Sequence, residues 1–393
     1  MFGLAPVDAI YMDYAATTPV APEVMATMQA ALADFGNPSS SHAWGAQADA
    51  HVDAAAAALG AALGVASDTL VWTSGATESD NLAIMGAARY RAARGKHVIT
   101  SRTEHKAVID ACKQLEREGF EITWLTPEAD GRVTPGALAA ALRDDTVLVS
   151  LMWVNNEIGT INDIPALAAV VAEHDALFHV DAAQAFGKVP VAPAELAIDL
   201  MSVTAHKCYG PKGIGALYVA PRHGVQFEPL LFGGGQQGGR RPGTLPVHQI
   251  AGFGRAAALV SEQLEADRVR LDALGRDLAA RVLAVPGVVL NGSATERLQS
   301  IVNVSIEGVA GEALVAAMQP IALATGSACN SRDVAPSFVL RALGRDDVLA
   351  GASLRFSLGR SSTPEDVDTA ATRFEAAVTR LRDMAGDLAR VLP

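Results

Sequence analysis

A lysine and an aspartate stand where two strongly apolar runs of the sequence stop. Lys207 comes soon after "IDLMSV", and Asp181 directly follows "LFHV". Burial disfavours the charged form of a lysine, so a lysine at the end of a buried strand is either well paired or used in chemistry. A carboxylate in such a place is costly unless it meets a cation or hydrogen-bond donors. A structural ion pair would satisfy Asp181, whereas the two residues together suggest a reactive site.

A turn of small residues is a third feature of this kind. The stretch "TSGATESDNLAI" places such a turn at a helix start, where free N–H groups and the helix dipole attract an anion such as phosphate. Taken alone, an ordinary helix N-cap by Ser74 or Thr77, with Glu78 in the first turn, is the simpler interpretation of this stretch.

These three features together match the needs of one cofactor. An enzyme that uses pyridoxal 5'-phosphate (PLP) requires a lysine for a Schiff base, an aspartate for the pyridinium nitrogen and a phosphate cradle. The aspartate keeps the ring nitrogen protonated, so that the ring can withdraw electrons from the substrate α-carbon. The lysine must lose its proton to act as a nucleophile, which requires a pKa below the usual value of about 10.4. We therefore expect Lys207 to hold PLP.

Alternating β-rich runs and helical patterns, from residue 68 to about residue 220, must position these groups. This alternation predicts an α/β fold with a mostly parallel sheet that helices cover on both faces. In such folds the ligand lies beyond the carboxyl ends of the strands. Polar residues do follow the apolar runs, in "GATE", "RTEH", "NNE", "DAAQ" and "TAHK". The β-rich runs are "TLVWTS", "KHVITS", "EITWLT", "TVLVSLMWV", "ALFHVD", "DLMSV" and "GALYV".

A glycine-rich segment, residues 231–246, and a long amphipathic pattern, residues 260–285, follow the sheet. We expect the amphipathic helix to lead into a second, smaller α+β domain that holds "SIVNVSIEG", "GEALVAAM" and "GASLRFSLGR". The predicted large, PLP-binding domain spans residues 16–261. The predicted small domain combines residues 1–15 with residues 262–393 and carries the loop of Cys329.

The composition excludes several classes of protein. The chain has 393 residues and a net charge of -12, so we expect no direct binding of nucleic acid or of an acidic membrane. Three cysteines are too few for a disulfide framework, which favours a reducing cytoplasm. The start of the chain does not read as a signal peptide, and the apolar stretch "AAAAALGAALGVAS" is too short to span a bilayer.

A series of motifs from about Tyr11 to Arg360 resembles the cysteine desulfurases of the iron-sulfur cluster assembly type (IscS/NifS-like). These proteins belong to the class V aminotransferase family of PLP enzymes. The resemblance implies the PLP-dependent transferase fold (aspartate aminotransferase-like, fold type I). It also implies removal of sulfur from L-cysteine, giving L-alanine and an enzyme persulfide whose sulfur passes to acceptors in iron-sulfur cluster assembly or tRNA thiolation. The motifs are "YMDYAATTPV", "FGNPSSSH", "TSGATESDNLAI", "TEHKAV", "VNNEIGT", "HVDAAQ", "HKCYGPKGIGALYV", "GGGQQGGRRPGTLP", "GSACNS", "PSFVLRALG" and "RFSLGR".

The resemblance assigns roles around the cofactor ring. It implies that Lys207 forms the Schiff base with PLP and that Asp181 pairs with the pyridine nitrogen. Gln184 would donate to the phenolic oxygen of the ring, and Asn156 would lie nearby on the substrate side. His105 would stack on the ring and shuttle protons; without the resemblance it reads as a polar loop histidine.

The resemblance also assigns the phosphate and substrate contacts. The positions that match phosphate contacts are Ala76, Thr77, Thr204 and His206. Thr244 matches a phosphate contact made across the interface of a homodimer with shared active sites. Arg355, which alone reads as an ordinary strand arginine, matches the guanidinium that grips the substrate α-carboxylate in a two-pronged contact.

Cys329 lies in a run of small and polar residues, "ATGSACNSRDVAP", which is typical of a mobile loop. A buried small hydrophobe is the alternative, because free cysteines are usually buried. The resemblance makes Cys329 the nucleophile that takes the sulfur and carries it outward to an acceptor. It implies no resident metal, although Cys329 could transiently contact an iron-sulfur cluster. We expect Cys112 and Cys208 to be structural.

Several positions depart from the family's pattern. Trp153 stands where relatives usually carry histidine, Ala183 and Ala185 replace the usual threonine and serine, and Thr204 replaces a common serine. These changes could adjust rate or substrate preference. The chain stops soon after "DLARVLP", whereas relatives that dock a cluster scaffold often extend further, which argues against docking of a scaffold protein. A selenocysteine lyase or another PLP-dependent C–S lyase, and a non-enzymatic scaffold-binding partner protein, are the alternatives.

Overall fold

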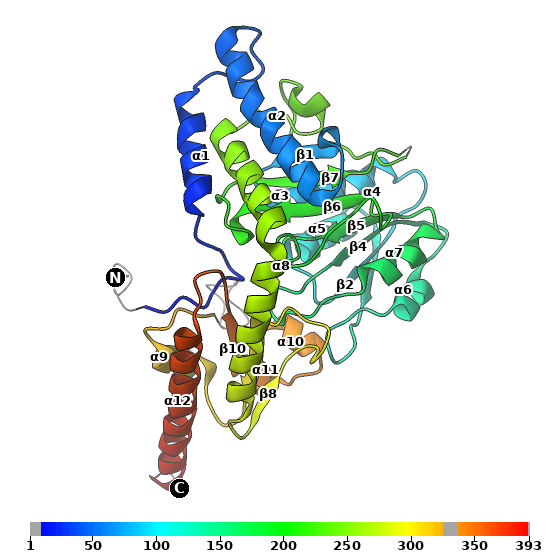
Figure 1. Cartoon of the computed structure of the whole chain (residues 1–393). Coiled ribbons are helices and arrows are strands. Elements are labelled where there is room, and N and C mark those ends of the chain that lie inside the picture. The colour runs from blue at the N-terminus through cyan, green and yellow to red at the C-terminus, as the bar shows by residue number, and fades with distance from the viewer. Residues whose placement is uncertain (1–8, 223, 325–335, 392–393) are drawn as a thin grey trace.

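The computed structural model describes residues 9–222, 224–324 and 336–391. A 7-stranded sheet forms its centre, with the strand order β1-β7-β6-β5-β4-β2-β3 (Figure 1). The pairs β6–β5, β5–β4, β4–β2 and β2–β3 are parallel, whereas β7 is antiparallel to both β6 and β1. The prediction of a mostly parallel sheet is confirmed. The strands are β1 (Leu70–Thr73), β2 (His97–Ser101), β3 (Glu121–Leu125), β4 (Thr146–Met152), β5 (Leu177–Asp181), β6 (Leu200–Thr204) and β7 (Gly215–Val219).

The strands inside the sheet are buried along their whole length, as continuous apolar runs predict for a sheet with two covered faces. Strand β3 lies at an edge, and most of its residues are partly exposed. The helices that connect or flank these strands are α1 (Pro22–Ala33), α2 (Ala43–Leu63), α3 (Ala76–Asn81), α4 (Ala87–Tyr90), α5 (Lys106–Arg117), α6 (Pro135–Ala141) and α7 (Ile164–Ala172).

Helix α8 (Val247–Leu283) runs alongside α1 and α2 and joins two hydrophobic clusters (Figure 1). It begins well before residue 260, where the amphipathic pattern starts. The earlier part is nearly apolar all round because it is buried against α1 and α2. A Cβ on Gly254 would lie 2.4 Å from the Ala55 Cα atom, so only glycine permits this contact between α8 and α2.

A second, smaller sheet has the strand order β10-β9-β8, and all its pairs are antiparallel. Its strands are β8 (Val288–Leu290), β9 (Ile301–Ile306) and β10 (Ser353–Ser357). The helices of this part are α9 (Gly311–Met318), α10 (Phe338–Ala342), α11 (Asp347–Gly351) and α12 (Pro364–Val391).

The two larger of the three hydrophobic clusters among the described residues match the predicted domains only in part, because the larger one also includes Leu298 and Ile301. Val260 belongs to the larger cluster, whereas Leu274 and Met12 belong to the smaller one. Near the N-terminus the chain changes cluster between Met12 and Ala15. The boundaries at residues 15 and 261 stay predictions.

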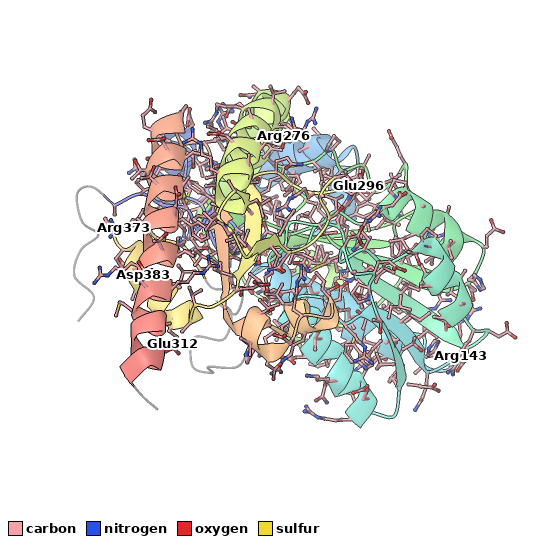
Figure 2. All side chains as sticks on the ribbon, turned by 90° about the horizontal axis from the view of Figure 1, so that it is seen from below. Arg143, Arg276, Glu296, Glu312, Arg373 and Asp383 are labelled. Atoms are coloured by element: carbon pink, nitrogen blue, oxygen red, sulfur yellow. The ribbon has the colours of Figure 1, made fainter. Side chains whose placement is uncertain are left out.

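Charged side chains gather on the outside of this arrangement, as Figure 2 shows for several outer helices and loops. The labelled residues are Arg143, Arg276, Glu296, Glu312, Arg373 and Asp383. Among the helices that the structure describes, none is both long enough and apolar enough to cross a membrane.

Candidate active site

A cavity of about 490 Å³ lies where the carboxyl ends of β4, β5 and β6 meet the turn after β1. Most of the predicted site residues line it: Ala76, Thr77, His105, Asn156, Asp181, Gln184, Thr204, His206, Lys207 and Arg355. Thr244 is exposed and does not line the cavity, and Cys329 lies outside the described residues. The structure thus brings together side chains from both sheets.

The turn between β1 and α3 forms one end of the cavity. Gly75 has φ 150°, a conformation that favours glycine. A Cβ on Gly215 would lie 2.7 Å from the Gly75 Cα atom, so β7 can begin beside this turn only because it starts with glycine. The first N–H groups of a helix have no partner within the helix. The N-terminal end of α3 therefore offers hydrogen-bond donors to an anion.

Lys207 ends a short 3-10 turn (Ala205–Lys207) that directly follows β6. Its charge affects two neighbouring histidines. Burial and then Lys207 lower the pKa of His105, and the same causes lower the pKa of His206 to about 4. Both imidazoles therefore favour the neutral form near neutral pH.

His105 caps the start of α5, and its Nδ1 atom accepts the Ala107 N–H at 3.2 Å. This bond leaves the Nε2–H of the neutral ring as a donor. A neutral imidazole that is fixed in this way can lie against a flat ring and can exchange a proton.

Asp181 ends β5 and is 5% exposed, and its Oδ1 atom accepts the Ala183 N–H at 2.8 Å. Two further carboxyls, Asp80 and Glu104, are buried nearby. Burial raises the pKa of both, and the charge of Asp181 raises it further. His179 lies 3.6 Å from Asp80, and burial lowers its pKa to about 3. Buried polar groups that favour their neutral forms thus lie near Asp181.

Gln184 has its amide orientation fixed from two sides. Its Nε2 atom donates to the Ala15 carbonyl at 2.7 Å, and its Oε1 atom accepts a bond from Lys188 Nζ. The Ala15 carbonyl can only accept, so the amide nitrogen must face it and the amide oxygen must face Lys188. The second N–H of Gln184 then remains for a ligand in the cavity.

Arg355 lies in β10 and reaches the cavity from the smaller sheet. Its Nη1 atom donates to the Asn156 carbonyl at 2.8 Å, and its Nη2 atom pairs with Asp13 Oδ1 at 2.7 Å. Its Nε atom is buried and has no hydrogen-bond partner among the described residues. The guanidinium is thus held in place and keeps donor capacity for a carboxylate.

The residues of the cavity fit PLP. The volume lies within the range of small-molecule sites. Lys207 provides the amine, Asp181 an acid, and the α3 turn the donors that this cofactor needs.

Some groups of the site were not predicted from the sequence. The sequence predicted no role for Asp13 or Lys188, although Asp13 lies in the motif "YMDY" and Lys188 follows Gln184 by four residues. Asp13 acts through a tertiary contact with Arg355, whereas Lys188 contacts Gln184 from only four residues further along the chain.

The positions that depart from the family's pattern are buried. Trp153 packs in the larger hydrophobic cluster, and Ala185 is 0% exposed; neither lines the cavity. Ala183 and Thr204 do line it.

The two described cysteines are buried thiols. Burial raises the pKa of Cys208 to about 12 and raises the pKa of Cys112 as well. Neither therefore favours the reactive thiolate.

Comparison with known proteins gives a consistent result. The chain matches the aminotransferase class-V family over residues 10–369. It is 50% identical over 380 residues to cysteine desulfurase IscS of Pseudomonas entomophila (strain L48). The aligned residues cover 96% of this chain and 94% of that protein. A solved NifS-like protein has a TM-score of 0.88 at 32% identity, covering 95% of this chain and 100% of the other. SspA in complex with cysteine has a TM-score of 0.79 at 36% identity, covering 90% of this chain and 100% of the other.

Proposed function

Because this chain belongs to the aminotransferase class-V family, we propose that it is a PLP-dependent cysteine desulfurase. The observation that carries the proposal is the meeting of Lys207, Asp181 and Arg355 in one cavity. The likeness to a curated cysteine desulfurase over 96% of the chain supports the same activity. The fold is that of PLP-dependent transferases of fold type I.

Lys207 would hold the cofactor covalently, and Asp181 would pair with its ring nitrogen. The bound cofactor supplies an electron sink for the bonds of the substrate α-carbon. His105 would lie against the ring, and Gln184 would donate its second amide N–H to the phenolic oxygen. The phosphate contacts would come from Ala76, Thr77, Thr204 and His206, which line the same cavity.

Arg355 would bind the α-carboxylate of L-cysteine, with Asn156 beside it. The Cys329 thiolate would attack the substrate sulfur, so that an S–S bond forms as the C–S bond breaks. The substrate Cβ gains a proton and leaves as L-alanine, while Cys329 keeps the sulfur as a persulfide. The reaction is balanced without an added oxidant or reductant.

We further propose a homodimer in which Thr244 reaches the phosphate of the partner's site. The segment around Thr244 borders a cleft whose other wall includes Pro38 and Asp49 of the α2 region. Large apolar side chains are exposed in these two regions, with Phe232 at 87% and Trp44 at 57%. Exposed apolar groups of this size favour a protein interface.

Cytoplasmic location and delivery of the sulfur to an acceptor or scaffold protein complete the proposal. The absence of a membrane-crossing helix among the described residues is compatible with this location. Iron-sulfur cluster assembly and tRNA thiolation are the two candidate destinations of the sulfur.

The test is the yield of alanine and of persulfide from L-cysteine with and without a reductant. We expect PLP-loaded protein to release sulfide continuously with a reductant and to retain persulfide without one. Cys329→Ser should abolish persulfide, and Cys112→Ser serves as the matched control that should retain it. Alanine formed only from selenocysteine or from another thiol would indicate one of the related lyases. Failure to bind PLP would indicate a non-enzymatic partner protein.

A further inference from the structure

Glu78 places a carboxylate at the end of the cavity where the phosphate of the proposed cofactor would lie. It is the third residue of α3 and lines the cavity together with Ala76 and Thr77. Its Oε2 atom accepts the Ser74 N–H at 2.6 Å, so the carboxylate lies directly against the turn. An unpaired carboxylate at this position would repel a phosphate dianion.

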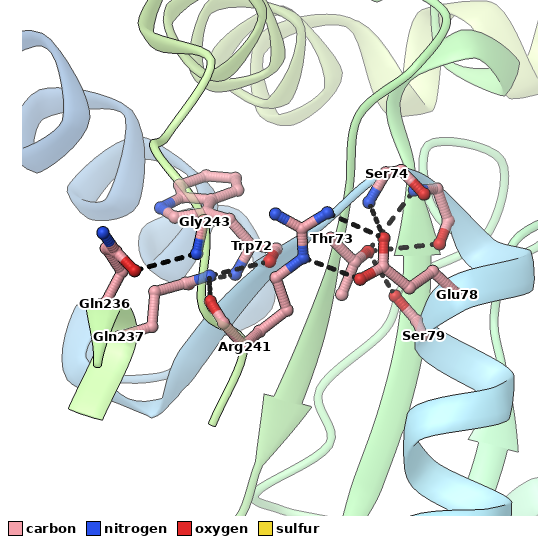
Figure 3. A network of polar contacts seen from close by, with 10 residues as sticks. Trp72, Thr73, Ser74, Glu78, Ser79, Gln236, Gln237, Arg241 and Gly243 are labelled. Carbon is pink, nitrogen blue, oxygen red and sulfur yellow. Dashed lines mark hydrogen bonds and ion pairs between the residues drawn. The ribbon is translucent and has the colours of Figure 1, made fainter. Parts of the chain in front are cut away.

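Arg241 pairs with both oxygens of this carboxylate (Figure 3). Its Nε atom donates to Oε1 at 2.7 Å, and its Nη2 atom donates to Oε2 at 3.1 Å. The side chains of Arg241 and Glu78 are only 18% and 19% exposed, so the pair is partly shielded from solvent. Burial acts to raise the pKa of Glu78, but the bonds from Arg241 and Ser74 outweigh it and lower the pKa. The carboxylate is therefore held ionised and matched by one cation.

The segment that carries Arg241 has a second anchor on the edge strand β1. Gln237 accepts the Trp72 N–H at 2.6 Å and donates to the Trp72 carbonyl at 2.9 Å (Figure 3). One amide thus pairs with the strand edge as a neighbouring strand would. Gln237 also donates to the Arg241 carbonyl at 3.2 Å, which fixes the backbone next to the ion pair.

We propose that Arg241 is a positioning residue that neutralises Glu78 at the phosphate end of the active site. The guanidinium prevents the carboxylate from opposing the phosphate. This inference rests on the proposed function, because it needs a phosphate-bearing ligand in the cavity.

The charges predict opposite effects for two variants that break the same ion pair. Arg241→Gln leaves Glu78 unpaired beside the phosphate, so cofactor binding should weaken about tenfold. Glu78→Gln leaves the guanidinium unpaired and keeps an oxygen for the Ser74 N–H, so binding should stay within about twofold of the wild type or become tighter. A merely structural ion pair would lose binding equally in both variants.

The experiment is titration of cofactor-free protein with PLP, followed by visible absorbance, at low and high salt. The double variant Glu78→Gln with Arg241→Gln should bind within about threefold of the wild type, because no unpaired carboxylate remains. Arg241→Lys keeps the charge without the two-pronged contact, should lose less than about threefold and replaces Arg241→Gln if that variant does not fold. Arg89→Gln is the matched control, because it breaks a similar two-pronged pair with Glu118 away from the cavity.

The pattern of the dissociation constants decides the outcome. The inference is supported if only Arg241→Gln binds PLP more weakly than the wild type and if this difference in affinity becomes smaller at high salt. Equal weakening in Arg241→Gln and Glu78→Gln, or unchanged binding in Arg241→Gln, overturns it. Wild-type protein that binds no PLP would instead refute the proposed function.

Discussion

The contribution of Lys188 to the free energy of unfolding should depend on pH. Its Nζ atom donates to Gln184 Oε1 beside the active-site cavity. Burial, followed by the charge of Lys207, lowers the pKa of Lys188 from 10.5 to about 7. Replacement by methionine removes the titrating group and keeps a chain of similar length.

The cost of burying the charge of Lys188 can be estimated from the shift of its pKa. Each pKa unit corresponds to about 1.36 kcal/mol, so the shift of Lys188 sets a ceiling of about 5 kcal/mol on the cost of burying its charge. The side chain is only partly buried, and solvent screening reduces this cost to about 1–3 kcal/mol. The variant also loses the hydrogen bond to Gln184, which contributes about 1 kcal/mol.

The sign follows from proton linkage. Because the folded pKa lies below the unfolded one, the unfolded state binds more protons between about pH 7 and pH 10.5. The folding free energy that Lys188 contributes is therefore fully present above the unfolded pKa and is lost as the pH falls through the folded pKa. Lys188→Met should be as stable as the wild type or more stable at pH 6, and less stable at pH 9.5.

The assay is urea denaturation of PLP-saturated protein at pH 6, 7.5 and 9.5, followed by circular dichroism. The difference in unfolding free energy between the variant and the wild type should change by about 1–3 kcal/mol across this range. Lys113→Met, on the surface of α5 with a side chain that is 53% exposed, is the matched control and should show no such change. A difference for Lys188→Met that is the same at every pH would refute the reasoning.

Three further variants test other parts of the structure. Arg355→Lys should raise KM for L-cysteine at least about tenfold in the alanine assay, since a lysine cannot hold Asp13 and also grip a carboxylate from two sides; an unchanged KM would exclude the assigned contact. Cys208→Ala should keep kcat within about twofold, because its buried Sγ atom donates to the Ala205 carbonyl at 3.2 Å; loss of persulfide would contradict this. Leu59→Ala should lower the unfolding free energy by about 2–5 kcal/mol, because the side chain is 0% exposed; a smaller loss in urea denaturation would mean that the helix repacks.

The main sheet could be predicted from the sequence because buried strands are short apolar runs that polar residues end. The same property predicted Asp181, Lys207 and Asn156 near one edge, since the ends of parallel strands meet there. The reversed direction of β7 was not predicted. The connection between Thr204 and Gly215 holds only a short turn, which is too short for a helical crossover and therefore requires antiparallel pairing.

The partners of the site residues could not be predicted, because they depend on how distant segments pack. Asp13 and Arg355 pair across a separation of 342 residues, and Glu78 and Arg241 across 163 residues. Neither separation has a periodic signal in the sequence. The early start of α8 was missed for a related reason, since only the contact with α2 explains an apolar helix that contains glycines.

The charged groups around the cavity influence one another's protonation. Burial and Lys207 together lower the pKa of Lys188, so the cationic groups lie near one another. Burial raises the pKa of Asp80 and of Glu104, and the charge of Asp181 raises both further. Since Asp80 and Glu104 thus favour their neutral forms, we propose Asp181 as the residue that would pair with a protonated ring nitrogen. Lys207, which lines the same cavity, would then supply the amine that holds the cofactor covalently, while Asp181 would pair with its ring nitrogen.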